Sequence, residues 1–231
     1  MSATPAAWIA GATATHRRIE NAIRNLTDAE ARQPSRLPDW TVGHLLTHLA
    51  RNADANTGMV QAAQKGEIGV QYPGGTAQRE GDIAAGAGRP AAELVADLTG
   101  AHQRLEAAWG ATQEDAWATG LARTTAAMRS VAHTVLLRWR EAEVHLCDLG
   151  LGPDWDGLSP AYIDVEWAEM TANLPRRAPE GTILFLIPGD RPSRTYGAGD
   201  NIVRVQAPSS RILQYLFGRG GDPSWPSLGA W

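Results

Sequence analysis

The sequence predicts an N-terminal, all-α four-helix bundle followed by a small C-terminal α+β domain. Apolar residues in the first 150 positions recur at helical spacing, in long segments joined by moderate loops. Residues 151–160 are rich in glycine and proline and resemble a linker. Short apolar runs of strand type follow it. We therefore expect a bundle domain over residues 1–150 and a smaller domain over residues 151–231.

Capping residues place the helices of the bundle. Thr41 is a good N-cap residue for the second long helix. Pro90 suits the first turn of the third, and Gly150 suits the C-terminal end of the fourth. The predicted long helices cover residues 5–26, 41–64, 90–109 and 125–149, with a shorter helix at 76–85.

The C-terminal domain is expected to combine helices with short strands. Ser159 suits an N-cap, and Gly220 and Gly221 suit the end of a last helix. The predicted elements are helices at 159–174 and 209–219 and strands at 182–187, 195–198 and 201–206. Such a unit, at about 80 residues, has few layers and a small core.

Composition excludes several classes of protein. The formal net charge is −4 and the pI is near 5.9, which argues against nucleic acid or an anionic membrane as the main partner. No stretch approaches the roughly 18 apolar residues of a membrane span. Because no signal segment is visible near the N-terminus, we expect a cytoplasmic protein. The single cysteine, Cys147, excludes an internal disulfide and a multi-thiolate zinc site.

Glu141 and His145 carry the strongest local signal for chemistry. They lie four residues apart on the predicted fourth helix, so both project from one face beside a broad apolar surface. A carboxylate and an imidazole in that setting form half of a metal site. Spacing alone favours the simpler interpretation, a surface Glu–His pair, because such pairs are common.

His44 and His48 repeat this spacing on the second helix. Combining His48 with Glu141 and His145 gives a His₂Glu set, which is typical of catalytic zinc because one coordination position stays open. For His44 we favour a structural role or a local hydrogen bond near the helix start. Spacing alone does not decide between the two histidines.

Four segments resemble the mycothiol-dependent maleylpyruvate isomerase family, a branch of the DinB-like metalloenzyme helical bundles. Residues 37–54 resemble the family's second-helix motif, and residues 140–150 resemble its fourth-helix motif. Residues 77–83 resemble the segment that supplies a substrate-binding arginine, and residues 214–222 resemble the family's C-terminal ending. The four matches follow the family's order along nearly the whole chain.

The resemblance implies specific roles. The metal ligands would be His48, Glu141 and His145, and the carboxylate-binding arginines would be Arg79 and Arg219. Zinc suits this donor set, although nickel, cobalt or iron could compete for it. Asp148 lies one turn after His145, where it is either an outer partner of that ligand or an acid at the helix end.

The resemblance also implies a reaction, the cis–trans isomerisation of the dicarboxylate maleylpyruvate to fumarylpyruvate. Addition of a metal-activated thiolate makes the double bond single for a moment, so that it can rotate. Cys147 faces away from the metal ligands on its helix, so the thiol must come from outside the chain, and the resemblance implies that it is mycothiol. Two alternatives stay open: a mycothiol S-transferase, and a non-catalytic protein that binds a metal or a small ligand.

Overall fold

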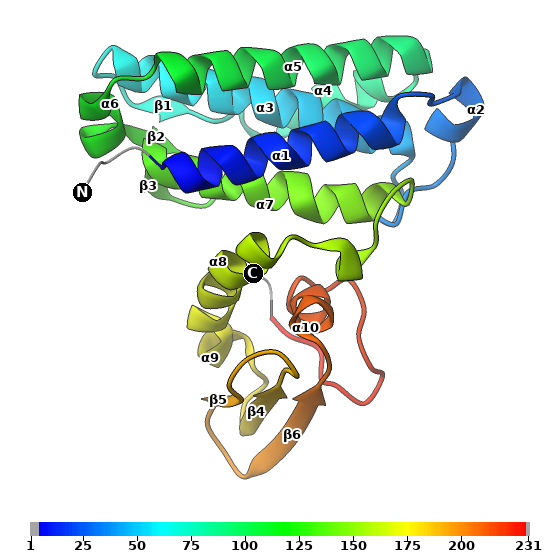
Figure 1. Ribbon diagram of the computed structural model, residues 1–231, viewed down its shortest axis with the longest axis vertical. Helices are drawn as coiled ribbons and strands as arrows, with labels where there is room; N and C mark the ends of the chain where they lie inside the picture. The colour runs from blue at the N-terminus through cyan, green and yellow to red at the C-terminus, as the bar shows by residue number, and fades with distance from the viewer. Residues whose placement is uncertain (1–4, 230–231) are drawn as a thin grey trace. The chain divides into compact units, whose positions relative to one another are not determined.

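The chain forms two compact units, residues 1–152 and 153–231, in a computed structural model that describes residues 5–229. The first unit is a helical bundle and the second combines helices with a small sheet (Figure 1). The predicted fold class is confirmed.

Four long helices run side by side in the first unit (Figure 1). Helix α3 packs against α5 and α7, and α1 packs against α7. The four helices are α1 (Ala6–Ile23), α3 (Val42–Gln64), α5 (Ala91–Ala111) and α7 (Val131–Leu149). Shorter helices are α2 (Asp28–Ala31), α4 (Gly75–Ala87) and α6 (Glu114–Thr119). The four predicted long helices are present, and α7 ends at Gly150 in the left-handed conformation, with φ of 71°.

The predicted start of the fourth helix near Thr125 is wrong. Residues before Ser130 instead belong to a small sheet with the order β1–β2–β3, formed by β1 (Gly69–Val70), β2 (Leu121–Arg123) and β3 (Met128–Ser130). Ser130 begins α7, because its hydroxyl accepts a hydrogen bond from the backbone N–H of His133. Strands of two or three residues are too short to show an alternating pattern, which is why the sequence did not predict this sheet.

Two glycines let α3 and α4 approach each other closely. A Cβ atom added at Gly43 on α3 would overlap the backbone oxygen of Ala87, and one added at Gly86 on α4 would overlap the side chain of Thr47. Any larger residue at either position forces the helices apart. The separation of α3 and α4 is therefore set by the absence of side chains.

The second unit has a three-stranded sheet in the order β5–β4–β6. Strand β4 runs parallel to β6 and antiparallel to β5. The strands are β4 (Thr182–Ile187), β5 (Arg194–Gly197) and β6 (Asn201–Gln206). The helices are η1 (Trp155–Gly157), α8 (Pro160–Ala172), α9 (Leu174–Arg177) and α10 (Ser209–Leu216). All three predicted strands are present, and the last helix ends three residues earlier than predicted. Within residues 5–229, no helix is both long and apolar enough to cross a bilayer.

A pair of histidines is buried in the core of the first unit. The rings of His16 and His102 are fully buried and stacked, with centroids 3.9 Å apart. The Nδ1 of His16 lies 2.8 Å from a Glu106 oxygen, and the Nδ1 of His102 lies 3.0 Å from a Glu20 oxygen. Arg138 donates from Nε to the Nε2 of His16. Because Nε2 accepts this bond, His16 is neutral.

Lowering the pH below about 6.5 is expected to destabilise the first unit. Burial holds the pKa of His102 at about 4 and, together with the nearby Arg138, holds the pKa of His16 well below its ordinary value. The unfolded chain therefore binds more protons than the folded chain in this range, so stability is lost as the pH falls. The free energy of unfolding should drop by up to about 3 kcal/mol for His102 alone.

Denaturant titrations at about pH 7 and about pH 4.5 measure this effect. His102→Gln removes one titrating ring and should make the free energy of unfolding less dependent on pH. His133→Gln, outside the buried pair, is the control and should keep the dependence of the unchanged protein. If His102→Gln keeps the full dependence, the stacked pair is not its source.

Candidate metal centre and substrate site

Two helices bring three potential metal ligands together. His48 comes from α3, and Glu141 and His145 come from α7. One donor atom from each residue lies within 4.8 Å of the other two, and no second group of this kind occurs among residues 5–229. The Nε2 of His48 lies 2.9 Å from Oε2 of Glu141, and the Nε2 of His145 lies 3.4 Å from the same oxygen. The three residues named from the sequence therefore converge on one point.

The charge states of Glu141 and His48 suit a divalent cation. Burial by itself would raise the pKa of Glu141, but hydrogen bonds with His145 and His48 outweigh it and hold that pKa well below its usual range. Burial lowers the pKa of His48. The site therefore offers a carboxylate and an uncharged imidazole, which are the forms that bind a metal.

Asp148 orients one of the three candidate ligands. Its Oδ2 lies 2.9 Å from Nδ1 of His145, and Asp148 itself is buried. A carboxylate on Nδ1 fixes the ring with Nε2 directed towards the other two ligands, as is usual for histidines that bind metals. The pKa of His145 is raised, because the hydrogen bonds with Asp148 and Glu141 outweigh the effect of burial. Two imidazole nitrogens and one carboxylate fit zinc with a coordination position left open.

His44 lies outside this group and has a local role at the start of α3. Its Nδ1 lies 2.8 Å from the Thr41 hydroxyl and accepts a hydrogen bond from the Thr41 backbone N–H. The Thr41 hydroxyl accepts in return from the backbone N–H of His44. This reciprocal arrangement has the pattern of a capping box, with histidine at the position that glutamate usually occupies. The local hydrogen bond favoured for His44 is the one found.

Arg79 extends from α4 to the three candidate metal ligands, which we call the metal group. Its Nη2 lies 3.2 Å from Nδ1 of His48, on the side of the ring opposite Glu141. Its guanidinium carbon lies 5.8 Å from the centre of the Tyr72 ring, within the range of a cation–π contact. A cationic group beside the three ligands is well placed to bind a carboxylate.

Arg219 belongs to the second unit, directly after α10. Its backbone N–H donates to the carbonyl of Gln214, and its Nη1 donates to the carbonyl of Phe217. Gly218 and Gly220 on either side have φ of 68° and 109°, which only glycine adopts without strain. The glycines therefore determine how this loop presents Arg219.

Comparison with known proteins decides the family. The family model described as "Mycothiol maleylpyruvate isomerase N-terminal domain" matches residues 12–150. The chain belongs to this family. Its structure is similar to the crystal structure of a mycothiol-dependent maleylpyruvate isomerase, with a TM-score of 0.87 and 26% sequence identity, over 97% of this chain and 95% of that chain.

A crystal structure of a histidine-to-alanine mutant of a mycothiol-dependent maleylpyruvate isomerase is also similar. The TM-score is 0.86 and the identity 25%, over 97% of this chain and 95% of that chain. Comparison with curated proteins finds no match. The family and the fold that the sequence motifs implied are thus confirmed.

Trp40 is a site residue in this family member that the sequence did not single out. Its ring meets the His48 ring edge-on, with centroids 5.6 Å apart. The preceding turn aims it there: the Trp40 N–H donates to the Leu37 carbonyl, and Asp39 has φ of 65°. A non-glycine residue in this conformation costs about 1 kcal/mol or more. The fold thus keeps a strained turn beside a candidate metal ligand.

Tyr72 and Arg138 were also missed. The Tyr72 hydroxyl is buried and completes no hydrogen bond within the described part of the chain, although Arg79 and Asn52 lie near it. Burial, and then the charge of Glu141, raise the pKa of Tyr72, so the hydroxyl keeps its proton. Arg138 is fully buried and donates from Nη1 to Asn52. Arg138 lies three residues before Glu141 on α7, and this helical spacing with Glu141 and His145 was the available signal for it.

Proposed function

We propose that this family member converts maleylpyruvate to fumarylpyruvate with mycothiol and a divalent metal, most suitably zinc. The observation that carries this proposal is the open His48–Glu141–His145 group with the Arg79 guanidinium against it. Membership of the family and similarity to the solved isomerases support the same reaction.

His48, Glu141 and His145 would hold the metal. When bound, zinc supplies a positive charge that lowers the pKa of a coordinating thiol, so that mycothiol can act as a nucleophile near neutral pH. Asp148 keeps the His145 ring in its binding orientation through the bond at Nδ1. The Trp40 ring packs edge-on against the His48 ring.

The arginines bind the substrate. Maleylpyruvate carries two carboxylates, and Arg79 would bind one of them beside the metal group. For the other carboxylate, Arg219 of the second unit is the arginine that the resemblance implies. Holding one carboxylate at Arg79 would fix one end of the substrate and place its double bond, and the other end would move relative to it when the central bond rotates.

Tyr72 supplies a neutral hydrogen-bond donor. When the double bond becomes single, negative charge develops on a substrate oxygen, and a donor already in place stabilises it. The hydroxyl of Tyr72 keeps its proton and lies close to Arg79. We therefore assign it to that oxygen.

The thiol balance tests the proposed function. Zinc-loaded protein is mixed with maleylpyruvate and a small amount of mycothiol, and product and free thiol are both measured. An isomerase returns the thiol, so many product molecules form per mycothiol and its concentration stays constant. An S-transferase consumes one mycothiol per product, and a binding protein forms no product. Either result would overturn the proposal.

Tyr72→Phe is expected to slow isomerisation by about a hundredfold, the usual effect of removing one donor to a developing negative charge. The phenylalanine ring still packs under Arg79, so bound zinc and the KM for maleylpyruvate should change little. Steady-state kinetics measures the effect, and Tyr196→Phe in strand β5 is the control. An unchanged kcat in Tyr72→Phe would remove the hydroxyl from the reaction.

A further inference from the structure

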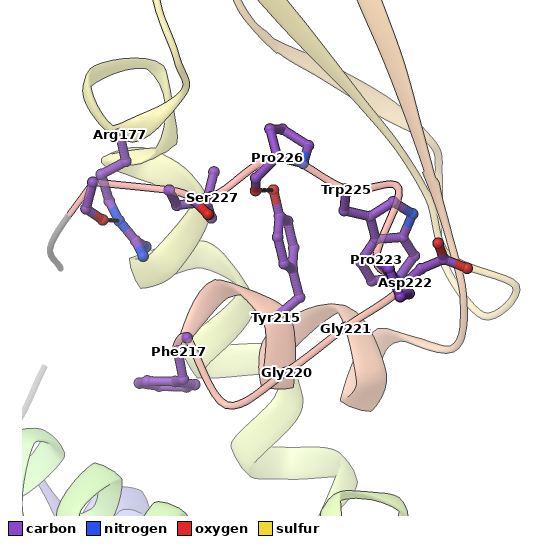
Figure 2. Close-up of a pocket in the computed structure, with 13 residues that line it drawn as sticks. Arg177, Tyr215, Phe217, Gly220, Gly221, Asp222, Pro223, Trp225, Pro226 and Ser227 are labelled. Atoms are coloured by element: carbon purple, nitrogen blue, oxygen red, sulfur yellow. Dashed lines mark hydrogen bonds between the residues drawn. The ribbon is translucent and has the colours of Figure 1, made fainter. Parts of the chain in front are cut away.

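A pocket lies within the second unit, and none of the candidate metal ligands lines it. Its volume is about 590 Å³, within the range of small-molecule sites. The pocket lies between the C-terminal end of α10, the glycine-rich loop that follows, and the segment Pro223–Gly229 that passes over them (Figure 2). The pocket is thus lined by residues of the second unit alone, whereas the candidate metal ligands belong to the first unit.

Arg177 at the end of α9 is a wall of this pocket and is nearly fully buried, with 7% of its surface exposed. It donates from Nε to the Gly229 carbonyl at 3.0 Å and from Nη2 to the Leu216 carbonyl at 2.5 Å. Its Nη1 has no hydrogen-bond partner within residues 5–229, and no carboxylate in that range forms an ion pair with it. Burial lowers the pKa of Arg177. A buried guanidinium without an anion is costly, and an anionic ligand would remove much of that cost.

Aromatic side chains form the apolar part of the wall. The Tyr215 hydroxyl donates to the Pro226 carbonyl at 2.7 Å, which ties the passing segment to α10. The Trp225 ring meets the Tyr215 ring with centroids 5.1 Å apart. In Figure 2 the Arg177 guanidinium and the Tyr215 ring border the space beneath Pro226 and Ser227. A flat apolar group fits a wall of this kind.

Asp222 limits the charge of the ligand. Its carboxylate also belongs to the pocket wall, on the side away from Arg177 (Figure 2). The backbone N–H and the hydroxyl of Ser224 both donate to it, so it is held in place as an anion. A second negative charge on the ligand would meet this carboxylate and be repelled. The pocket therefore suits one carboxylate and not two.

We propose that this pocket binds a small monocarboxylate with a planar apolar body, whose carboxylate pairs with Arg177 and whose body lies against Tyr215 and Trp225. The charge of Asp222 distinguishes it from a site for the dicarboxylate substrate. The binding needs neither the metal nor mycothiol, so its test is independent of the proposed isomerisation.

Benzoate is the probe, with benzamide as its uncharged counterpart of the same shape. Titrations of the full chain by calorimetry or by ligand-observed NMR should show saturable benzoate binding, and benzamide should bind about tenfold more weakly or less. Arg177→Gln should lose the preference for benzoate. Arg176→Gln, which replaces the exposed neighbouring arginine, should bind benzoate like the unchanged protein.

Arg177 also holds backbone carbonyls, so Arg177→Gln could unfold the second unit. Ser227→Trp fills the pocket from its exposed side and leaves Arg177 in place, and thermal unfolding checks that this variant is folded. Loss of benzoate binding in folded Ser227→Trp supports the site. Absence of saturable benzoate binding, equal binding of benzamide, equal loss in Arg176→Gln, or full binding in Ser227→Trp would each overturn it.

Discussion

Replacing His48, Glu141 or His145 is expected to release the metal and to slow isomerisation of maleylpyruvate by at least about a thousandfold. Each of the three supplies one donor atom to a single point, and with two donors the chain cannot hold zinc tightly. The variants His48→Ala, Glu141→Gln and His145→Ala test this. Metal per chain is measured by elemental analysis after dialysis, and activity is measured in the presence of mycothiol.

His44→Gln is the matched control for these variants. His44 lies one turn before His48 on the same helix but hydrogen-bonds with Thr41. The control should retain its metal and most of its activity, although the weaker cap lowers the stability of α3 by about 1 kcal/mol. If all three ligand variants kept one zinc per chain, the ligand assignment would be wrong.

Leaving out the low-molecular-weight thiol is expected to remove isomerisation entirely. The first unit offers only Cys147 as a thiol of its own, and that side chain is buried. Cys147 lies two residues from His145 on α7, so it points away from the face that carries the ligands. The nucleophile must therefore enter from solution, and activity should rise from zero as mycothiol is added to the metal-loaded protein.

Cys147→Ser separates this explanation from a role for the internal thiol. The variant removes the thiol from the chain but leaves the metal ligands and Arg79 intact. It should isomerise maleylpyruvate at nearly the normal rate when mycothiol is present. Turnover by the unchanged protein without added thiol, lost in Cys147→Ser, would make Cys147 the nucleophile.

Helices of the bundle could be predicted because each is long enough to repeat its apolar pattern several times. The small sheet of the first unit could not, since its strands hold two or three residues and are defined by pairing with distant segments. The wrong start of α7 has the same origin. The sequence of residues 128–130 does not disfavour a helix, and these residues form a strand only because they pair with β2.

The candidate site divides in the same way. Spacing placed Glu141 and His145 on one face, and the resemblance joined His48 and Arg79 to them. Tyr72 could not be identified from its position, because its importance rests on a buried hydroxyl near Asn52 and Arg79, two residues far from each other in the sequence. Asp148 was left open between two roles, and only the 2.9 Å distance to His145 settles which partner it has.

The glycine contact between α3 and α4 makes the distance between these two helices adjustable by substitution. His48 of the candidate metal ligands lies on α3, whereas Arg79 lies on α4. The distance between a metal bound there and the Arg79 guanidinium would therefore follow the spacing of these two helices. Gly86 lies seven residues from Arg79, about 10 Å along α4. A methyl group at Gly43 or Gly86 would widen this spacing. It would thereby change which acids fit between the metal and Arg79, although no residue that contacts the substrate is replaced. Substitutions at these two glycines, outside the active site, could thus adapt such an enzyme to longer substrates.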